Sequence, residues 1–155
     1  MSFINKKKSF LFSLIFLFCF STDIVAQKLE NSSELVRLYK EYRFVQQKKT
    51  NWVDTIDNWS GKFHTIMSKV GDTLGKPIYS KQDILNLLGK PDEIISRSNR
   101  KNTAELYNII NNKPISEIKK NEEYLVYKWR GFHDFLYFYI KSNVVQYSKW
   151  YYSWE

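Results

Sequence analysis

The chain has 155 residues, a formal net charge of +8 at pH 7, and 17% aromatic residues. This length fits one domain that folds around its own core without a metal or a crosslink. A single cysteine, Cys19, excludes an internal disulfide framework. Basic residues are spread over residues 28–149 with acidic residues among them, whereas nucleic-acid binding requires a concentrated basic stripe. A nucleic-acid partner is therefore not predicted.

Residues 1–26 have the layout of a secretory signal peptide. Three consecutive lysines at residues 6–8 precede an apolar run over residues 9–21, and Ala26 supplies a small residue for cleavage. The run is shorter than the roughly 20 apolar residues that span a bilayer as a helix. We predict cleavage after Ala26, which leaves one mature domain over residues 27–155.

The same leader predicts the compartment. Cleavage after Ala26 removes Cys19, so the mature domain has no thiol chemistry. Phe18 stands where a lipoprotein signal has a small residue, so the pattern does not predict lipid attachment. We expect an exported protein, periplasmic or associated with the outer membrane. Its basic surface is compatible with anionic partners or with contact at a membrane surface.

Two helical patterns open the mature domain. Apolar residues three or four apart predict a helix over residues 33–47 and a second one over residues 51–70. Asn51 is the expected N-cap of the second helix, and Gly61 inside it marks a kink or a close contact. Two glycines, Gly71 and Gly75, are expected to end it. Its predicted apolar face holds Trp52, Val53, Ile56, Trp59, Phe63, Ile66, Met67 and Val70.

The next helix has the clearest start and stop signals in the chain. Ser80 and Asp83 form a capping-box pattern at its start, and Gly89 stands at the left-handed cap position. Pro91 follows two residues later, as is common past a helix end. A short strand is predicted over residues 92–96. Residues 97–122 are polar and rich in Asn and Lys, and they are predicted as a mobile surface excursion with a short helix in its middle.

The C-terminal stretch is aromatic and β-branched, and it predicts a sheet. Runs over residues 124–129, 134–140 and 144–152, joined by short turns, are typical of an antiparallel meander. In the middle run, alternation separates two faces. Leu136, Phe138 and Ile140 are expected against the helices, and Phe135, Tyr137 and Tyr139 on a partly exposed face. The predicted fold is α+β, with two to three N-terminal helices packed on one face of a three- to four-stranded antiparallel meander.

The order of these elements resembles a known family. A capped helix ending in Leu87, Leu88, Gly89, Lys90, Pro91 and Asp92, then a polar stretch, then the strand 124–129 and two more strands, is similar to the SmpA/OmlA (BamE-like) domains. The resemblance covers residues 80–92 and 124–147. These are small bacterial envelope domains with two helices on a three-stranded antiparallel sheet, and the family acts in outer-membrane β-barrel assembly. The resemblance implies this fold and an envelope location.

Two aromatic clusters are candidate binding sites. At the first hairpin turn, Trp129, Arg130, Phe132, His133 and Asp134 are arranged to grip an anionic or carbonyl group, with Asp134 orienting the imidazole. The alternative is a structural hairpin, in which Gly131 permits the bend, Arg130 stacks on a ring and Asp134 satisfies turn amides. At the C-terminus, Trp150, Tyr152 and Trp154 share one side of a strand. They form either an exposed platform for a protein, a glycan or a membrane interface, or the last strand of the core over Trp52 and Trp59.

Catalytic patterns are missing from the sequence. The two histidines, His64 and His133, have no zinc-site spacing around them, and there is no nucleophile elbow, phosphate-binding loop or dinucleotide fingerprint. We therefore expect no metal and no cofactor. The sequence favours a non-catalytic binding module of the bacterial envelope with a protein partner. The alternatives are a small ligand-binding protein or enzyme acting at residues 129–134, and a periplasmic inhibitor or immunity protein suggested by fold analogy alone.

Overall fold

A computed structural model of the chain describes residues 32–48, 51–58, 60–130 and 134–152. The chain divides into two units, Met1–Glu34 and Leu35–Glu155. Of the first unit, only residues 32–34 are described, and they are helical. The sheet and the numbered helices all belong to the second unit.

Helices come first along the second unit, and most of the strands come last. Residues 35–48 of this unit are helical, and we call them the leading helix, which precedes the numbered elements. They are α2 (Asp54–Asp57), α3 (Lys62–Leu74), α4 (Lys81–Leu88), β1 (Glu93–Ser96), α5 (Arg100–Asn111), the 3-10 turn η1 (Ile115–Glu117), β2 (Glu122–Arg130), β3 (Asp134–Lys141) and β4 (Val144–Tyr152). The predicted α+β class, with helices N-terminal and strands C-terminal, is confirmed.

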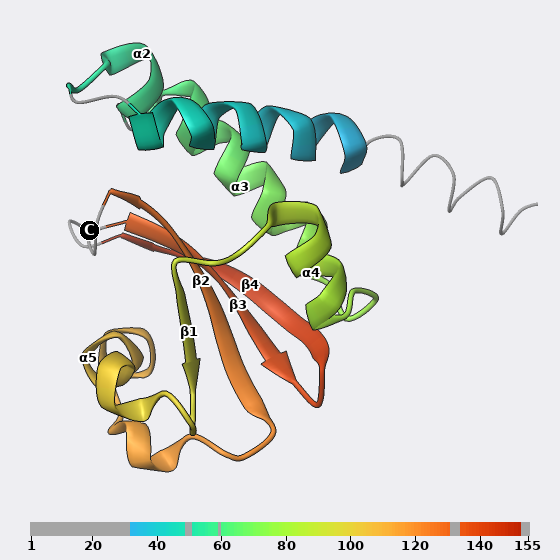
Figure 1. Cartoon of the computed structure of the whole chain (residues 1–155), viewed down its shortest axis with the longest axis vertical. Helices are drawn as coiled ribbons and strands as arrows, with labels where there is room; N and C mark the ends of the chain where they lie inside the picture. Colours follow the sequence, from blue (N-terminus) through green and yellow to red (C-terminus); the bar gives the residue numbers. More distant parts are fainter. Residues whose placement is uncertain (1–31, 49–50, 59, 131–133, 153–155) are drawn as a thin grey trace, which may run out of the picture. The chain divides into compact units, whose positions relative to one another are not determined.

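The four strands form one antiparallel sheet in the order β1-β2-β3-β4. The meander of β2, β3 and β4 is the predicted one, and β1 adds the fourth strand beside β2. The leading helix, α3 and α4 lie on one side of the sheet, and α5 lies on the other (Figure 1). We call the side under α3 and α4 the first face, and the side under α5 the second face.

The first face holds the larger core. Leu136, Phe138 and Ile140 point to it from β3 and are nearly inaccessible to solvent, as predicted. Tyr39 of the leading helix, and side chains of α3 and α4, pack on these residues. In α3 the contact residues recur three and four apart, which is the spacing of one helix face. They are Phe63, Ile66, Met67, Val70 and Leu74.

The second face is more covered than predicted. Phe135 and Tyr137 are buried, and only Tyr139 of this set is half-buried. The cover comes from residues 97–122, predicted as a surface excursion, because α5 packs Leu106 and Tyr107 against β2 and β3. A helix inside this segment is confirmed, but it builds a second core. The polar composition of residues 97–122 did not indicate this role, because a single short row of apolar residues on a helix is enough to cover part of a sheet.

The predicted helix over residues 51–70 is two helices. The chain breaks between α2 and α3, and Gly61 is the N-cap of α3. A Cβ at Gly61 would lie 2.5 Å from the carbonyl oxygen of Ile56, so the glycine permits this close approach. Val53, and not Asn51, is the N-cap of α2. Trp52, predicted on an apolar helix face, is 54% exposed because it precedes the helix.

Two glycines bring α3 close to the sheet. Gly75 ends the helix, as predicted, but Gly71 lies inside it. The carbonyl oxygen of Gly71 accepts a 2.8 Å hydrogen bond from the Ser148 hydroxyl of β4. A Cβ on Gly71 would lie 2.9 Å from Leu136 Cδ1, so a larger residue would push the helix away.

The start and end of α4 follow the predicted signals. The Ser80 hydroxyl accepts from the Asp83 amide at 3.1 Å, and the Asp83 carboxylate accepts from the Ser80 amide at 2.7 Å. The bond from the Ser80 amide, followed by a 2.8 Å bond from the Ser80 hydroxyl to the same carboxylate, holds the pKa of the Asp83 carboxyl below its ordinary value. Gly89 caps the helix with a positive φ of 81°.

An ion pair joins the leading helix to the sheet. The Arg43 guanidinium lies 2.6 and 2.7 Å from the two carboxylate oxygens of Asp92, just before β1, and donates to the Lys128 carbonyl of β2 at 3.1 Å. Asp92 also accepts from the Lys128 amide at 2.6 Å. The guanidinium carbon lies 6.0 Å from the ring centres of Tyr39 and Tyr127. Three segments far apart in sequence therefore meet at one buried cation.

Replacing Arg43 with Met should destabilise the fold by about 2 kcal/mol, because the half-buried Asp92 carboxylate loses its counter-charge. The free energy of unfolding from urea titration measures this. Arg37→Met is the matched control, since Arg37 forms its ion pair with Glu41 at the surface of the same helix, with both side chains more than half exposed. It should cost less than about 0.5 kcal/mol. Equal losses in the two variants would contradict the role given to Arg43.

Candidate functional site

The predicted hairpin site is only partly described by the structure. Phe132 and His133 lie outside the described residues, and of Arg130 only the backbone in β2 is described. Trp129 and Asp134 are buried, at 2% and 1% exposure. Neither presents its side chain to solvent, so neither is a surface contact, and the binding role predicted for the hairpin stays a prediction. Alternation along a strand places the Trp129 ring on the first face, inside the core.

Trp150 belongs to the same core as Trp129. The His64 ring of α3 stacks on Trp150 with centres 5.5 Å apart and planes 9° apart, and it lies 5.3 Å from Trp129. The two indoles themselves lie 6.1 Å apart. Trp150 is half-buried and packs against the core of the first face. Of the two residues that it was predicted to cover, Trp52 is 54% exposed and Trp59 lies outside the described residues. Tyr152 is described only in its β4 backbone, and Trp154 lies outside the described residues.

An exposed aromatic surface occurs instead on the second face of β3 and β4. We call it the tyrosine surface, and it consists of Tyr139, Tyr147, Lys149 and Tyr151. Tyr147 is 41% exposed, Lys149 is exposed, and the other two rings are half-buried. The register puts Tyr147 opposite Tyr139, and Tyr151 opposite Phe135. Cross-strand partners lie on one side of a sheet, so these four residues share the second face.

Ring contacts fix the tyrosine surface in place. Tyr139 and Tyr147 lie 5.2 Å apart between ring centres, and Tyr139 contacts Tyr124 of β2 at 5.0 Å. Tyr151 stacks on Phe135 at 4.8 Å. Aromatic pairs at these separations each contribute roughly 0.5–1.5 kcal/mol beyond the burial of their area. The rings are therefore held by the sheet beneath them.

The charges around the tyrosine surface are unequal. The Tyr139 hydroxyl donates to the Glu122 carboxylate at 2.9 Å, at the start of β2. Further along, residues 135–152 contain Lys141 and Lys149 and no Asp or Glu. Burial, followed by the hydrogen bond to Glu122, raises the pKa of Tyr139 to about 12. Tyr139 therefore remains neutral at physiological pH, and Lys149 is the basic residue in the middle of the surface.

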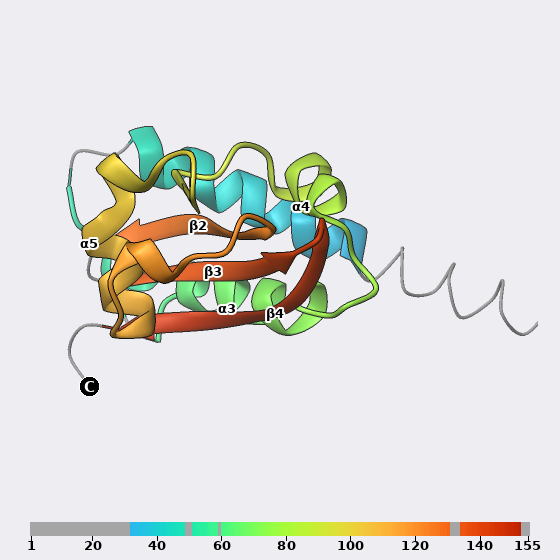
Figure 2. The ribbon, with the colours of Figure 1, turned by 90° about the horizontal axis from the view of Figure 1, so that it is seen from below.

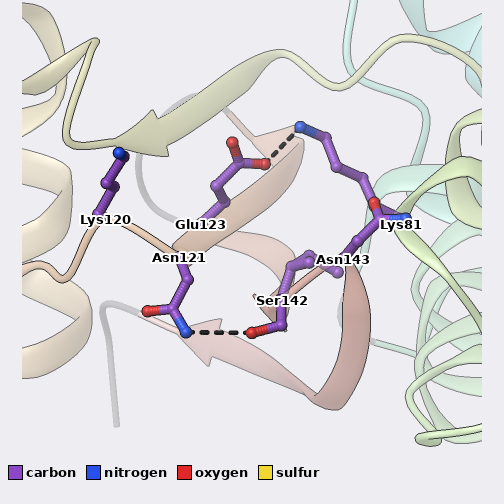
Figure 3. A pocket seen from close by; sticks show the side chains of 7 residues that line it. Lys81, Lys120, Asn121, Glu123, Ser142 and Asn143 are labelled. Carbon is purple, nitrogen blue, oxygen red and sulfur yellow. Dashed lines mark hydrogen bonds and ion pairs between the residues drawn. The ribbon is translucent and has the colours of Figure 1, made fainter.

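A small hollow lies at the opposite end of the sheet from the predicted hairpin site (Figure 3). Its walls come from the first turn of α4, the start of β2 and the turn between β3 and β4. The lining residues are Lys81, Lys120, Asn121, Glu123, Ile140, Ser142 and Asn143. Ser142 and Asn143 have positive φ angles of 49° and 67°, which is typical of the two central residues of a tight hairpin turn.

Most polar groups of this hollow bond to one another. Lys81 forms an ion pair with Glu123, and the Asn121 side-chain amide donates to the Ser142 hydroxyl at 3.1 Å. The hollow has a volume of about 160 Å³, below the roughly 300–1,000 Å³ of small-molecule sites. The ion pair joins α4 to β2, and the amide of Lys81 donates to the Asn143 carbonyl of the β3–β4 turn at 2.9 Å. The sequence did not indicate the hollow, and only the Ser-Asn turn could have located one wall of it.

No family model, no curated protein and no solved structure matches this chain. Within the described residues, no three His, Cys, Asp or Glu side chains gather closely enough to hold a metal ion. None of the described helices has the length and apolar character to cross a bilayer. The tyrosine surface is therefore the candidate site that the geometry itself identifies.

The buried tyrosines should make the protein sensitive to alkali. Burial is the largest cause that raises the pKa of Tyr137 and Tyr139 from 10.0 to about 12. Between these values the unfolded chain has lost protons that the folded chain retains, so stability is full below pH 10 and falls as pH rises to 12. Urea midpoints measured across this range should decline, with the tyrosinate absorbance rising as the chain unfolds. Tyr137→Phe should reduce the slope, and an unchanged slope would contradict this cause.

Proposed function

We propose that the chain is an exported, non-catalytic binding module of the bacterial cell envelope that engages a protein partner through the tyrosine surface. One observation carries the proposal, namely that Tyr147 remains 41% exposed, whereas the other rings described in the sheet are buried or half-buried. Tyrosine is enriched where proteins bind proteins. Its flat ring offers a large contact area and loses little conformational entropy on binding.

The construction of the site supports binding more than chemistry. Tyr139, Tyr147 and Tyr151 lie on two neighbouring strands whose far side is packed against α3, so their backbone positions are fixed before a partner arrives. A preformed surface keeps the ordering cost of association low. In the hairpin cluster predicted as an alternative site, Trp129 and Asp134 are buried, which favours the tyrosine surface as the contact.

The envelope location follows from the first 26 residues and from the resemblance of residues 80–92 and 124–147 to SmpA/OmlA domains. The leader has the basic, apolar and small-residue parts of a signal peptide in order. Cleavage after Ala26 removes the only cysteine, so the exported domain has to be stable without a disulfide. The two cores of the sheet supply this stability.

Removing the exposed Tyr147 ring should weaken binding of the partner without unfolding the domain. For Tyr147→Ala we expect about tenfold weaker binding to the partner recovered from envelope extracts, because a central interface tyrosine often contributes more than 1 kcal/mol. Phe44→Ala is the matched control, since Phe44 is an exposed ring, at 57%, on the leading helix. It should bind as the unaltered chain does. Urea midpoints of both variants check the fold.

A photo-reactive residue gives a second measurement in intact cells. Placed at position 147 it should form a covalent adduct with the partner, and placed at position 44 it should not. Adducts of equal yield at both positions, or binding unchanged in Tyr147→Ala, would remove the tyrosine surface from the proposal.

Export predicts a defined mature N-terminus. After expression with its own leader in a Gram-negative host, mass spectrometry of the protein should find Gln27 as its first residue, in the periplasmic or outer-membrane fraction. Ala26→Leu should slow the processing, because the cleavage site requires a small residue. Recovery of the chain with Met1 intact in the cytoplasm would contradict this location.

A further inference from the structure

The outer edge of β4 has an uncovered length of backbone. β4 is the last strand of the sheet and pairs with β3 on its inner side (Figure 2). Its start is covered, because the Val145 amide donates to the Tyr79 carbonyl at 2.9 Å and Ser80 bridges to Val144. Beyond that point, no strand of the described chain lies against the outer side of residues 146–152. An uncovered edge presents a row of backbone donors and acceptors to another chain.

The side chains along this edge have a definite chemistry. Tyr147, Lys149 and Tyr151 alternate on the second face, so the edge and the tyrosine surface are parts of one structure. Residues 135–152 contain no carboxylate that could neutralise Lys149 within the hairpin. In a sheet, an opposite charge on the neighbouring strand is favourable and a like charge is not. A strand added beside β4 is therefore best matched when it brings a carboxylate opposite Lys149.

We propose that β4 accepts an extended, carboxylate-bearing segment of the partner protein as a fifth strand. This inference rests on the proposed function and adds the class of partner and the mode of contact. Backbone hydrogen bonds along residues 146–152 provide attachment, and the acidic side chain opposite Lys149, between the Tyr147 and Tyr151 rings, provides selectivity. A second copy of this chain fits less well. Pairing β4 with β4 would bring lysine to an edge without a carboxylate, whatever the register.

Synthetic peptides test the chemistry directly. We would titrate the full mature chain with a ten-residue peptide of alternating glutamate and valine, with its lysine-for-glutamate counterpart, and with a copy of the glutamate peptide methylated at every amide nitrogen. The glutamate peptide should bind and slow hydrogen exchange at the amides of residues 146–152. The lysine peptide should not bind, because its lysines repel Lys149. The methylated peptide should not bind, because it has no amide N–H groups to donate to β4.

A charge reversal provides the matched variant. Lys149→Glu should lower the affinity for the glutamate peptide about tenfold and raise the affinity for the lysine peptide by a similar factor. The substitution turns the favourable cross-strand pair with glutamate into an unfavourable one, and the reverse for lysine. Lys141→Glu is the control, because Lys141 pairs with Val144 at the covered start of the strand. It should change both affinities less than twofold. A reversal in peptide preference cannot arise from loss of folding.

Several outcomes would overturn the inference. The inference is wrong if all three peptides bind equally, or if the glutamate peptide binds without protecting the amides of residues 146–152. It is also wrong if the chain without peptide forms a dimer that protects these amides, because a second copy then occupies the edge. The proposed function is judged separately. If Tyr147→Ala weakens binding of the natural partner but no peptide slows hydrogen exchange in β4, strand addition is wrong and the tyrosine surface remains the proposed contact. If Tyr147→Ala leaves the partner unaffected, both are wrong.

Discussion

The fold is governed by a sheet that is apolar on both of its faces. β2 and β3 direct large apolar side chains to both sides of the sheet, and helices pack on each side. The leading helix, α3 and α4 cover the first face, and α5 covers part of the second. Burial of large apolar side chains, at roughly 1.5–3 kcal/mol each, is the dominant favourable contribution. The polar contacts then decide how each cover is aligned.

Those polar contacts lie at the seams between the helices and the sheet. Arg43 bonds to Asp92 and to the Lys128 carbonyl, which fixes the leading helix against the β1–β2 end of the sheet. Gly71 and Ser148 fix α3 against β4, and Lys81 with Glu123 fixes α4 near the β3–β4 turn. Each contact lies at the border of an apolar layer. Burial of apolar surface is non-directional, so the hydrogen bond there sets how the helix is oriented on the sheet.

The candidate site is a consequence of incomplete cover. α5 is twelve residues long and covers only part of the second face, and the rings of Tyr147 and Tyr151 on β4 keep part of their surface in contact with solvent. The same strand is the open border of the sheet, and Lys149 lies in its middle. An exposed ring set, an uncovered edge and a lysine among uncharged rings thus coincide on one strand. This coincidence supports a binding role in which recognition uses both side chains and backbone.

Some features of this protein were determined by local sequence alone. The capping residues Ser80, Asp83 and Gly89 set the limits of α4, and period-two alternation set the strands and placed Leu136, Phe138 and Ile140 toward the helices, because caps and alternation act over a few residues. The exposure of each ring depended on distant contacts. Trp150 packs on the core through the His64 ring of α3, the 97–122 segment covers the sheet through the contact of Tyr107 with Tyr124, and Tyr147 stays 41% exposed. Burial is a property of the assembled layers, so only the tertiary structure could separate binding surface from core.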